Sequence, residues 1–308
     1  MYAAIAHFFG MALDLFYRRR HLGGAVPREG SVLIVANHPN GLIDPATVLR
    51  VAGREVRFLG KEPLFRMPVI GWILRALRAL PIYRAQDGHD TSANHGTFDA
   101  VFDSLAAGDC VCLFPEGISH SEPQLQPLKT GAARMALGAE ARTGFDLGVH
   151  IVPVGLNYRD KSVFRSELAV QIGDPLSCAD LASAHAEDPI GAARLLTERI
   201  DVAIRALTVN MEAWADAPLL KLAGALWAPD DDPVAALRAA AAAQRDFLRR
   251  APEATEALRR RVEELHQALE DLGLDPRDLD NRYPLPGVLR FAGRNLFALL
   301  FGLPVALL

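Results

Sequence analysis

The chain has 308 residues, of which 50% are apolar and 23% are charged, a composition that excludes a disordered or collagen-like protein and allows one large or two modest domains. Its 33 basic and 37 acidic residues leave a net charge of −4, so the molecule as a whole lacks the basic surplus of a nucleic-acid-binding protein. Three cysteines cannot all pair, which indicates a reducing compartment, and we expect buried thiols at Cys110, Cys112 and Cys178.

The N-terminal segment, residues 1–21, is predicted to be an amphipathic helix lying in a membrane interface. It ends in three arginines, the opposite charge order to a secretory signal peptide. On a helix, His7, Gly10, Asp14 and Arg18 form a polar stripe opposite an apolar face. The arginines would then face anionic lipid, which predicts a membrane-associated protein on the cytoplasmic side. The alternative is a helix packed on the protein's own core.

Residues 22–178 alternate short apolar runs with helical segments, a pattern typical of an α/β core with a mixed, mostly parallel sheet flanked by helices. The apolar runs are rich in Val, Ile, Leu and Phe, as strands buried on both faces are. They span residues 32–36, 56–59, 110–114, 149–156 and 168–172. Helices are expected at 91–107 and 131–142, each with a glycine close behind it.

The C-terminal part lacks strand signals. Residues 179–283 are rich in Ala, Leu, Arg and Glu and are predicted to form a helical extension, broken at 228–233 and at 251–252 by prolines. Residues 284–308 are predicted to be an apolar tail associated with the membrane. Its uncharged run, 296–308, is too short to span a bilayer.

The first candidate site is the polar turn after the strand at 32–36. It reads Asn37-His38-Pro39-Asn40-Gly41-Leu42-Ile43-Asp44-Pro45. A histidine that leaves an apolar strand into such a turn is expected to face solvent or substrate. Asp44 has a second interpretation, because an aspartate directly before a proline is typical of a helix N-cap.

Two further polar clusters follow apolar runs. Leu80-Pro81-Ile82-Tyr83-Arg84 ends in a planar cation suited to phosphate. Phe114-Pro115-Glu116-Gly117-Ile118-Ser119-His120 ends another strand, and its glycine allows backbone N–H groups to approach a ligand. This segment lacks the second glycine of a serine-hydrolase nucleophile elbow.

Together these segments resemble the PlsC-type glycerolipid acyltransferase family over roughly residues 20–175. The matching positions are Asn37, His38, Asp44, Lys61, Pro81, Ile82, Arg84, Phe114, Pro115, Glu116, Gly117, Ser119 and Pro153. Five residues separate His38 from Asp44, where the usual family motif has four. That longer spacing resembles yeast-type glycerol-3-phosphate acyltransferases, and Gly41 can absorb the extra residue by adopting a positive φ.

The resemblance implies an O-acyltransferase of phospholipid synthesis. It would move a fatty acyl group from acyl-CoA or acyl carrier protein to a hydroxyl of glycerol 3-phosphate or lysophosphatidate at a membrane surface, with no cofactor and no metal. His38 would be the general base and Asp44 would orient its ring. The residues implied to bind substrate are Asn37, Lys61, Arg84, Glu116, Gly117 and Ser119.

Two other classes of protein remain open. A non-catalytic lipid-binding protein, or pseudoenzyme, on the same fold is favoured by the altered His–Asp spacing. A metallohydrolase would use the imidazoles and carboxylates of His38, Asp44, His89, Asp90 and His95. No helical His-x-x-x-His pair supports such a metal site, so a solvated loop explains residues 89–95 better.

Overall fold

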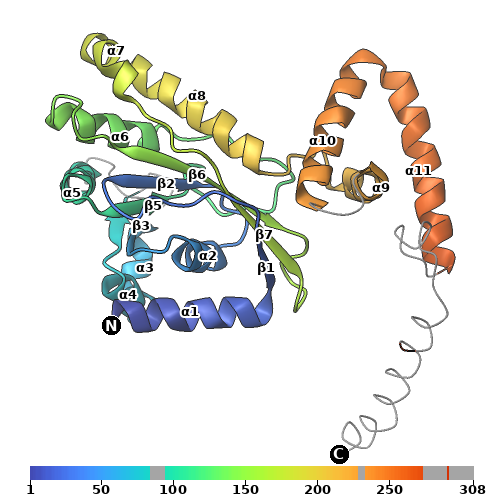
Figure 1. The fold of residues 1–308 in the computed structure, drawn as a ribbon, viewed down its shortest axis with the longest axis horizontal. Helices are drawn as coiled ribbons and strands as arrows, with labels where there is room; N and C mark the ends of the chain where they lie inside the picture. Colours follow the sequence, from blue (N-terminus) through green and yellow to red (C-terminus); the bar gives the residue numbers. More distant parts are fainter. Residues whose placement is uncertain (84–93, 228–232, 273–289, 291–308) are drawn as a thin grey trace, which may run out of the picture.

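The computed structural model describes residues 1–83, 94–227, 233–272 and 290, and its ribbon is drawn in Figure 1. Within these residues seven strands form one sheet, in the order β1-β7-β6-β2-β5-β3-β4. Neighbouring strands are parallel except for β6 and β7. The strands are β1 (Arg18–His21), β2 (Val32–Ala36), β3 (Val56–Lys61), β4 (Leu80–Ile82), β5 (Cys110–Leu113), β6 (His150–Tyr158) and β7 (Glu167–Ile172).

Helices cover both faces of this sheet (Figure 1). On one face lie α1 (Tyr2–Phe16) and α2 (Ile43–Val51), and on the other lie α5 (Asn94–Ala106), α6 (Gly131–Arg142) and α8 (Pro189–Leu207). The short helices α3 (Glu62–Arg66) and α4 (Pro68–Ala76) follow β3, and α7 (Ala182–Glu187) precedes α8. The predicted fold class, a mixed and mostly parallel sheet flanked by helices, is confirmed.

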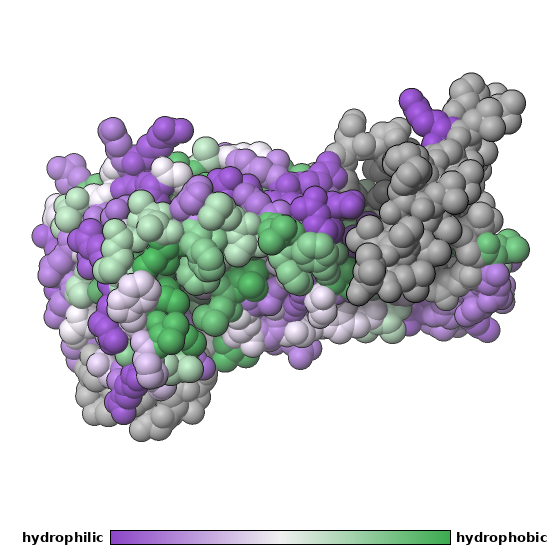
Figure 2. All heavy atoms as spheres, turned by 90° about the horizontal axis from the view of Figure 1, so that it is seen from below, coloured by the Kyte–Doolittle hydropathy of each residue, from purple (hydrophilic) through white to green (hydrophobic). Residues whose placement is uncertain are grey.

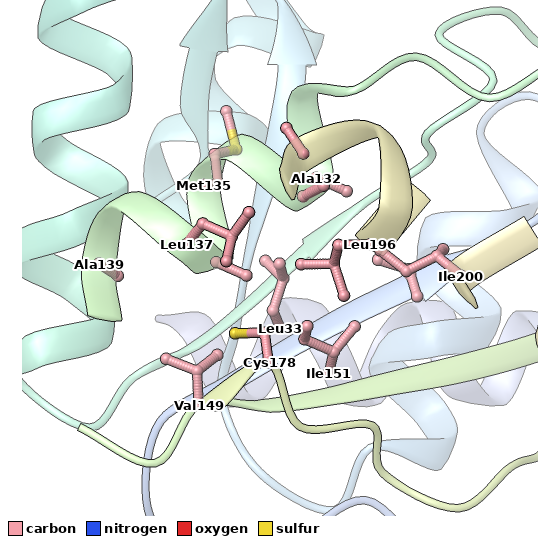
Figure 3. Packing of buried hydrophobic residues seen from close by; sticks show 14 of the residues in the cluster. Leu33, Ala132, Met135, Leu137, Ala139, Val149, Ile151, Cys178, Leu196 and Ile200 are labelled. Atoms are coloured by element: carbon pink, nitrogen blue, oxygen red, sulfur yellow. The ribbon is translucent and has the colours of Figure 1, made fainter. Parts of the chain in front are cut away.

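Strand β2 runs through the centre of the sheet and contributes to two apolar cores. Successive side chains of a strand point to opposite faces. Leu33 therefore packs with Leu137 of α6 and Leu196 of α8 (Figure 3), whereas Ile34 packs in the other core with Val48 of α2. All five residues of β2 are buried, which explains why the strand has no polar alternation in the sequence.

Two strands were not predicted. Helix α1 ends at Phe16, and Arg18–His21 form the edge strand β1 beside β7, so the prediction of one helix over residues 1–21 is wrong at its end. A strand at the edge of a sheet has a neighbour on one side only, and charged side chains on it can reach solvent. Such a strand therefore need not appear in the sequence as an apolar run. The other, β4, pairs with β3 at the opposite edge and contains Pro81, which edge strands tolerate.

Gly10 and Asp14 of the polar stripe predicted along α1 face the protein, whereas His7 and Arg18 are exposed. Asp14 forms ion pairs with Arg19 and with Arg50 of α2, each at 3.0 Å. Gly10 lies so close to Arg50 that a Cβ there would come within 2.7 Å of its side chain. Leu13, on the predicted lipid face, is buried in the core. Only part of the apolar face of α1 is therefore left exposed.

The division predicted at residues 178 and 179 does not separate two cores. Leu196, Ile200 and Ile204 of α8 are buried in the same core as β2. The later helices α9 (Ala217–Trp227) and α10 (Pro233–Arg250) pack in a separate small cluster around Met211 and Leu220, and α11 (Pro252–Leu272) contacts both of these helices. The helical extension is thus present, and its first long helix belongs to the α/β core. The predicted tail, 284–308, lies outside the described residues except for residue 290.

All three cysteines are buried as free thiols. Burial raises the pKa of Cys110 and of Cys178 to about 12, so both stay protonated near neutral pH and are poor nucleophiles. Among the helices of the described residues, none combines the length and the apolar character needed to cross a bilayer.

Candidate active site

His38 leaves the carboxyl end of β2 and its ring lies against the ring of Phe114. The two rings are stacked, with centroids 4.0 Å apart and planes 12° from parallel. The Nδ1 atom of His38 lies 2.8 Å from Oδ2 of Asp44. The stacking and the hydrogen bond together hold the ring in one orientation. Because His38 also lines the large cavity described below, the other ring nitrogen, Nε2, is the one left for a ligand.

The five-residue spacing between His38 and Asp44 does not prevent their contact. Gly41 takes a positive φ of 39°, and its N–H donates to Oγ of Ser119 at 2.8 Å. The N–H of Asn40 donates to Oδ2 of Asp44 at 2.6 Å. The backbone of the turn therefore donates a hydrogen bond directly to the Asp44 carboxylate. Asp44 is the second residue of α2 and is not its N-cap, so the capping interpretation is wrong.

The Asp44 side chain is fully buried and accepts three hydrogen bonds. Besides Nδ1 of His38 and the N–H of Asn40, the hydroxyl of Tyr158 donates to its Oδ1 at 2.7 Å. Burial, and next the charge of Asp44, hold the pKa of Tyr158 well above its usual range, so the phenol remains a donor. Tyr158 ends β6, and no local pattern in the sequence connects it with Asp44, 114 residues earlier.

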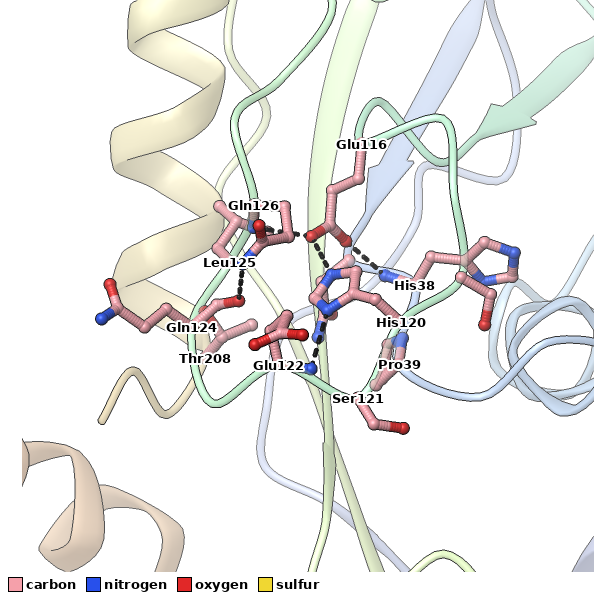
Figure 4. A network of polar contacts seen from close by, with 12 residues as sticks. His38, Pro39, Glu116, His120, Ser121, Glu122, Gln124, Leu125, Gln126 and Thr208 are labelled. Carbon is pink, nitrogen blue, oxygen red and sulfur yellow. Dashed lines mark hydrogen bonds and ion pairs between the residues drawn. The ribbon is translucent and has the colours of Figure 1, made fainter. Parts of the chain in front are cut away.

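Glu116 does not face the cavity, contrary to the prediction that it binds substrate. Its side chain is completely buried. Oε1 accepts the backbone N–H of His38 at 2.7 Å, and Oε2 accepts the N–H of Gln126 at 2.8 Å and contacts the ring of His120 (Figure 4). Since both carboxylate oxygens are occupied by the protein, Glu116 fixes the backbone of His38 against the following loop.

The side chain of Asn37 also bonds the protein's own backbone. Its amide donates to the carbonyl of Leu156 at 2.9 Å and accepts the N–H of the same residue at 2.8 Å, which ties the end of β2 to β6. Asn37 does not line the cavity, whereas Gly117 and Ser119 do. Gly117 has a φ of 72°, and a Cβ there would lie 2.8 Å from Nζ of Lys129. The positive φ therefore favours glycine at this position, and a larger residue would also displace the end of the Lys129 side chain.

A cavity of about 1560 Å³ opens beside His38. Its walls are mostly apolar and come largely from α2, β3, α3, α4 and α5, with further residues from α6 and α8. They include Ala46, Leu49, Leu59, Leu64, Ile73, Leu74 and Phe98. The cations among the described lining residues are Lys61, which was predicted, and Lys129 and Arg134, which were not. Arg84 lies outside the described residues.

No group of three or more potential metal ligands occurs among the residues that the structure describes. His89 and Asp90 are outside those residues. His95 lies in the first turn of α5 and lines the same cavity as His38.

The sequence of this chain is similar to those of known acyltransferases. The sequence profile of the family described as Acyltransferase matches residues 19–157. Glycerol-3-phosphate O-acyltransferase 2 of Saccharomyces cerevisiae is 46% identical over 27% of this chain and 11% of its own length, and glycerol-3-phosphate O-acyltransferase 1 of the same yeast is 27% identical over 49% and 31%. A 1-acyl-sn-glycerol-3-phosphate acyltransferase of Bacillus subtilis is 25% identical over 61% of this chain and 86% of its own.

Residues 19–157 belong to the PlsC-type acyltransferase family. This acyltransferase domain contains His38, Asp44, Glu116 and the strands that carry them. The matched part of the chain spans less than a third of either yeast relative. The rest of each yeast protein is not aligned with this chain.

The hydroxyl of Tyr158 is expected to matter for the acyltransferase domain chiefly through its hydrogen bond to Asp44. Tyr158→Phe should lower kcat roughly tenfold while KM changes little, because one hydrogen bond to a buried carboxylate is lost and the His38 ring is held less firmly. Tyr2→Phe is a matched control, since the Tyr2 hydroxyl bonds only the backbone of Val56, far from His38. It should lower the unfolding temperature and leave kcat unchanged. Equal kcat in both variants would contradict a positioning role for Tyr158.

Proposed function

We propose that this protein transfers a fatty acyl group from acyl-CoA or acyl carrier protein to a hydroxyl of glycerol 3-phosphate or lysophosphatidate. The observation that carries the proposal is the 2.8 Å contact between His38 Nδ1 and Asp44 Oδ2 at the wall of a large apolar cavity. The names of the yeast and Bacillus relatives, which are acyltransferases of glycerol 3-phosphate and of 1-acyl-sn-glycerol 3-phosphate, support both acceptors.

In the proposed reaction, Nε2 of His38 takes the proton of the acceptor hydroxyl as its oxygen attacks the thioester carbonyl. The new C–O bond forms, the C–S bond breaks, and the proton passes from the imidazolium to the leaving thiolate. An alcohol is a poor nucleophile near neutral pH, so a base at this point contributes roughly 10²–10⁴-fold. Asp44 orients the ring through its contact with Nδ1 and stabilises the imidazolium that forms.

The acyl chain would occupy the apolar part of the cavity, where each buried CH₂ favours binding by about 0.8 kcal/mol. The cations Lys61 and Arg134 line the same cavity and supply the positive charge that an acceptor phosphate requires. Substrate head and acyl chain would therefore meet beside His38. Of the residues proposed to contact substrate, Gly117 and Ser119 lie on this wall.

We further propose that the protein works on the cytoplasmic face of a membrane, since its product is a lipid. The exposed side of α1 supports this: Phe8, Met11 and Leu15 point away from the core and are each more than half exposed. Figure 2 shows an apolar band across the face seen from below in Figure 1, bordered by hydrophilic residues. Such a band suits a surface lying against lipid.

The test is thiol release by the purified protein in lipid vesicles, with acyl-CoA and acyl carrier protein as donors and with glycerol 3-phosphate and lysophosphatidate as acceptors. We expect release that depends on one of the acceptors. Activity that survives a chelator would count against the metallohydrolase. If neither donor shows acceptor-dependent release, the enzyme proposal is wrong and a lipid-binding protein on the same fold is the better interpretation.

A further inference from the structure

A second, shallower groove lies on the edge of the sheet away from the cavity. It has a volume of about 660 Å³ and is formed by β1, the end of β6, the turn between β6 and β7, and the start of β7. None of its lining residues lines the large cavity. Four of them are arginines, and we call this site the arginine groove: Arg18, Arg20, Arg159 and Arg165.

The positive charge of the arginine groove is only partly neutralised. Glu167 is engaged by Arg20 at 3.1 Å. The other acid of the groove, Asp160, accepts the N–H of Ser162. Arg18 and Arg159 are exposed, and neither has an acidic partner within 4.0 Å among the described residues. The whole chain has a net charge of −4, whereas this groove has more arginines than acidic residues. The local excess of positive charge favours the binding of an anion.

Apolar side chains stand directly beside this charge. Val163 and Phe164, at the turn between β6 and β7, are 53% and 59% exposed. The ring of Phe164 meets that of Phe16 edge to face, with centroids 5.7 Å apart, and so continues the exposed apolar side of α1. Exposed aromatic and aliphatic side chains next to arginines are the combination that favours the interface of an anionic bilayer, where rings enter the lipid and guanidinium groups meet phosphates.

The turn is held firmly on the end of α1. Arg165 has a φ of 63°, a conformation that a non-glycine residue rarely adopts. Its N–H donates to the carbonyl of Phe16 at 2.6 Å, and its guanidinium donates to the carbonyl of Asp14 at 3.2 Å. These bonds fix the turn and the helix relative to each other. The groove and the apolar side of α1 therefore present one rigid surface.

We propose that the arginine groove binds the phosphate headgroups of anionic phospholipids in a bilayer, with Val163 and Phe164 inserted beside them. This site is separate from the cavity at His38, and it orients the domain on the membrane. Charge complementarity and the adjacent apolar turn favour a bilayer over a soluble anion, because a free phosphate would make no apolar contact with the exposed Phe164. The binding is measured without turnover, so it stands or falls independently of the enzymatic reaction.

The experiment is co-sedimentation of the full chain with vesicles of phosphatidylcholine alone and of phosphatidylcholine mixed with phosphatidylglycerol. Wild type should prefer the mixed vesicles. Arg18→Gln with Arg159→Gln should weaken binding to mixed vesicles roughly thirty-fold and leave binding to phosphatidylcholine unchanged. The matched control is Arg260→Gln with Arg261→Gln, which removes the same charge from exposed positions on α11 and should leave both affinities unchanged.

Phe164→Ser tests the apolar half of the site and should weaken binding to both kinds of vesicle. Circular dichroism checks that the variants fold, which we expect because the three replaced side chains are exposed. The proposal is overturned if the Arg18 and Arg159 variant binds mixed vesicles like wild type, or like the α11 control. It is equally overturned if inorganic phosphate at matched ionic strength displaces the protein, since the groove would then be a site for a free anion.

Discussion

We expect His38→Ala to lower kcat by roughly 10²–10⁴-fold, the contribution of a positioned general base. The folded state should survive the substitution. Asp44 keeps two of its three donors, from Asn40 and Tyr158, and the backbone N–H of His38 still donates to Glu116. Binding of the acyl donor should change little, because the apolar walls of the cavity remain intact. Single-turnover kinetics with a saturating donor measure the loss.

The matched control is His150→Ala. His150 is exposed at the amino end of β6, where it pairs with Val32 at the start of β2, whereas His38 follows the carboxyl end of β2. Its substitution removes the same side chain at the opposite end of the parallel strands β2 and β6 and should leave kcat unchanged. A His38→Ala variant with kcat within tenfold of the control would show that His38 is not the base, and the Asp44 contact would then have only a structural role.

The largest expected effect on stability is that of Glu116→Ala. This change leaves the N–H groups of His38 and Gln126 and the ring of His120 without their buried acceptor. Removing one member of a buried charged network costs about 3–5 kcal/mol of the free energy of unfolding. We expect urea denaturation to show a loss of that size. kcat should fall as well, because the backbone of His38 is no longer held.

Glu122→Ala provides the comparison on the same loop. Glu122 is exposed, and its hydrogen bond to the ring of His120 is donated by its backbone N–H, so the substitution should change stability by no more than about 0.5 kcal/mol. Glu116→Gln preserves shape and should give an intermediate loss, which remains measurable if the alanine variant does not fold. The opposite pattern would contradict this assignment: a raised KM for the acceptor with unchanged stability would return Glu116 to the substrate-binding role expected from the sequence.

The strands of the fold differ in how well the sequence predicts them. β2 and β5 are buried on both faces and appear as unbroken apolar runs, so their positions were predicted to within a residue. β1 consists of three arginines and a histidine. It is a strand only because it pairs with the free edge of β7. In this pairing Arg18 lies opposite Glu167, which is 149 residues later in the chain. Local sequence carries no sign of such pairing.

The candidate site shows the same contrast. His38, Asp44 and Gly117 were recognisable from residue type and spacing in the turns that follow buried strands. Tyr158 was not, since a tyrosine at the end of a strand has many possible partners. Glu116 was assigned to substrate because the family resemblance implies that role, and only the packing of the loop that follows it removes its side chain from the cavity.

The sequence by itself determined the class of fold, the family and the positions of the chemical groups, because these depend on periodicity and on short motifs within one segment. The tertiary structure decided which groups meet. It brought Asp44 within 2.8 Å of His38 through the positive φ of Gly41, and it placed β1 at the sheet edge, where its arginines form a groove with the β6–β7 turn. Contacts between segments far apart in the chain arise from packing, and no local pattern encodes them.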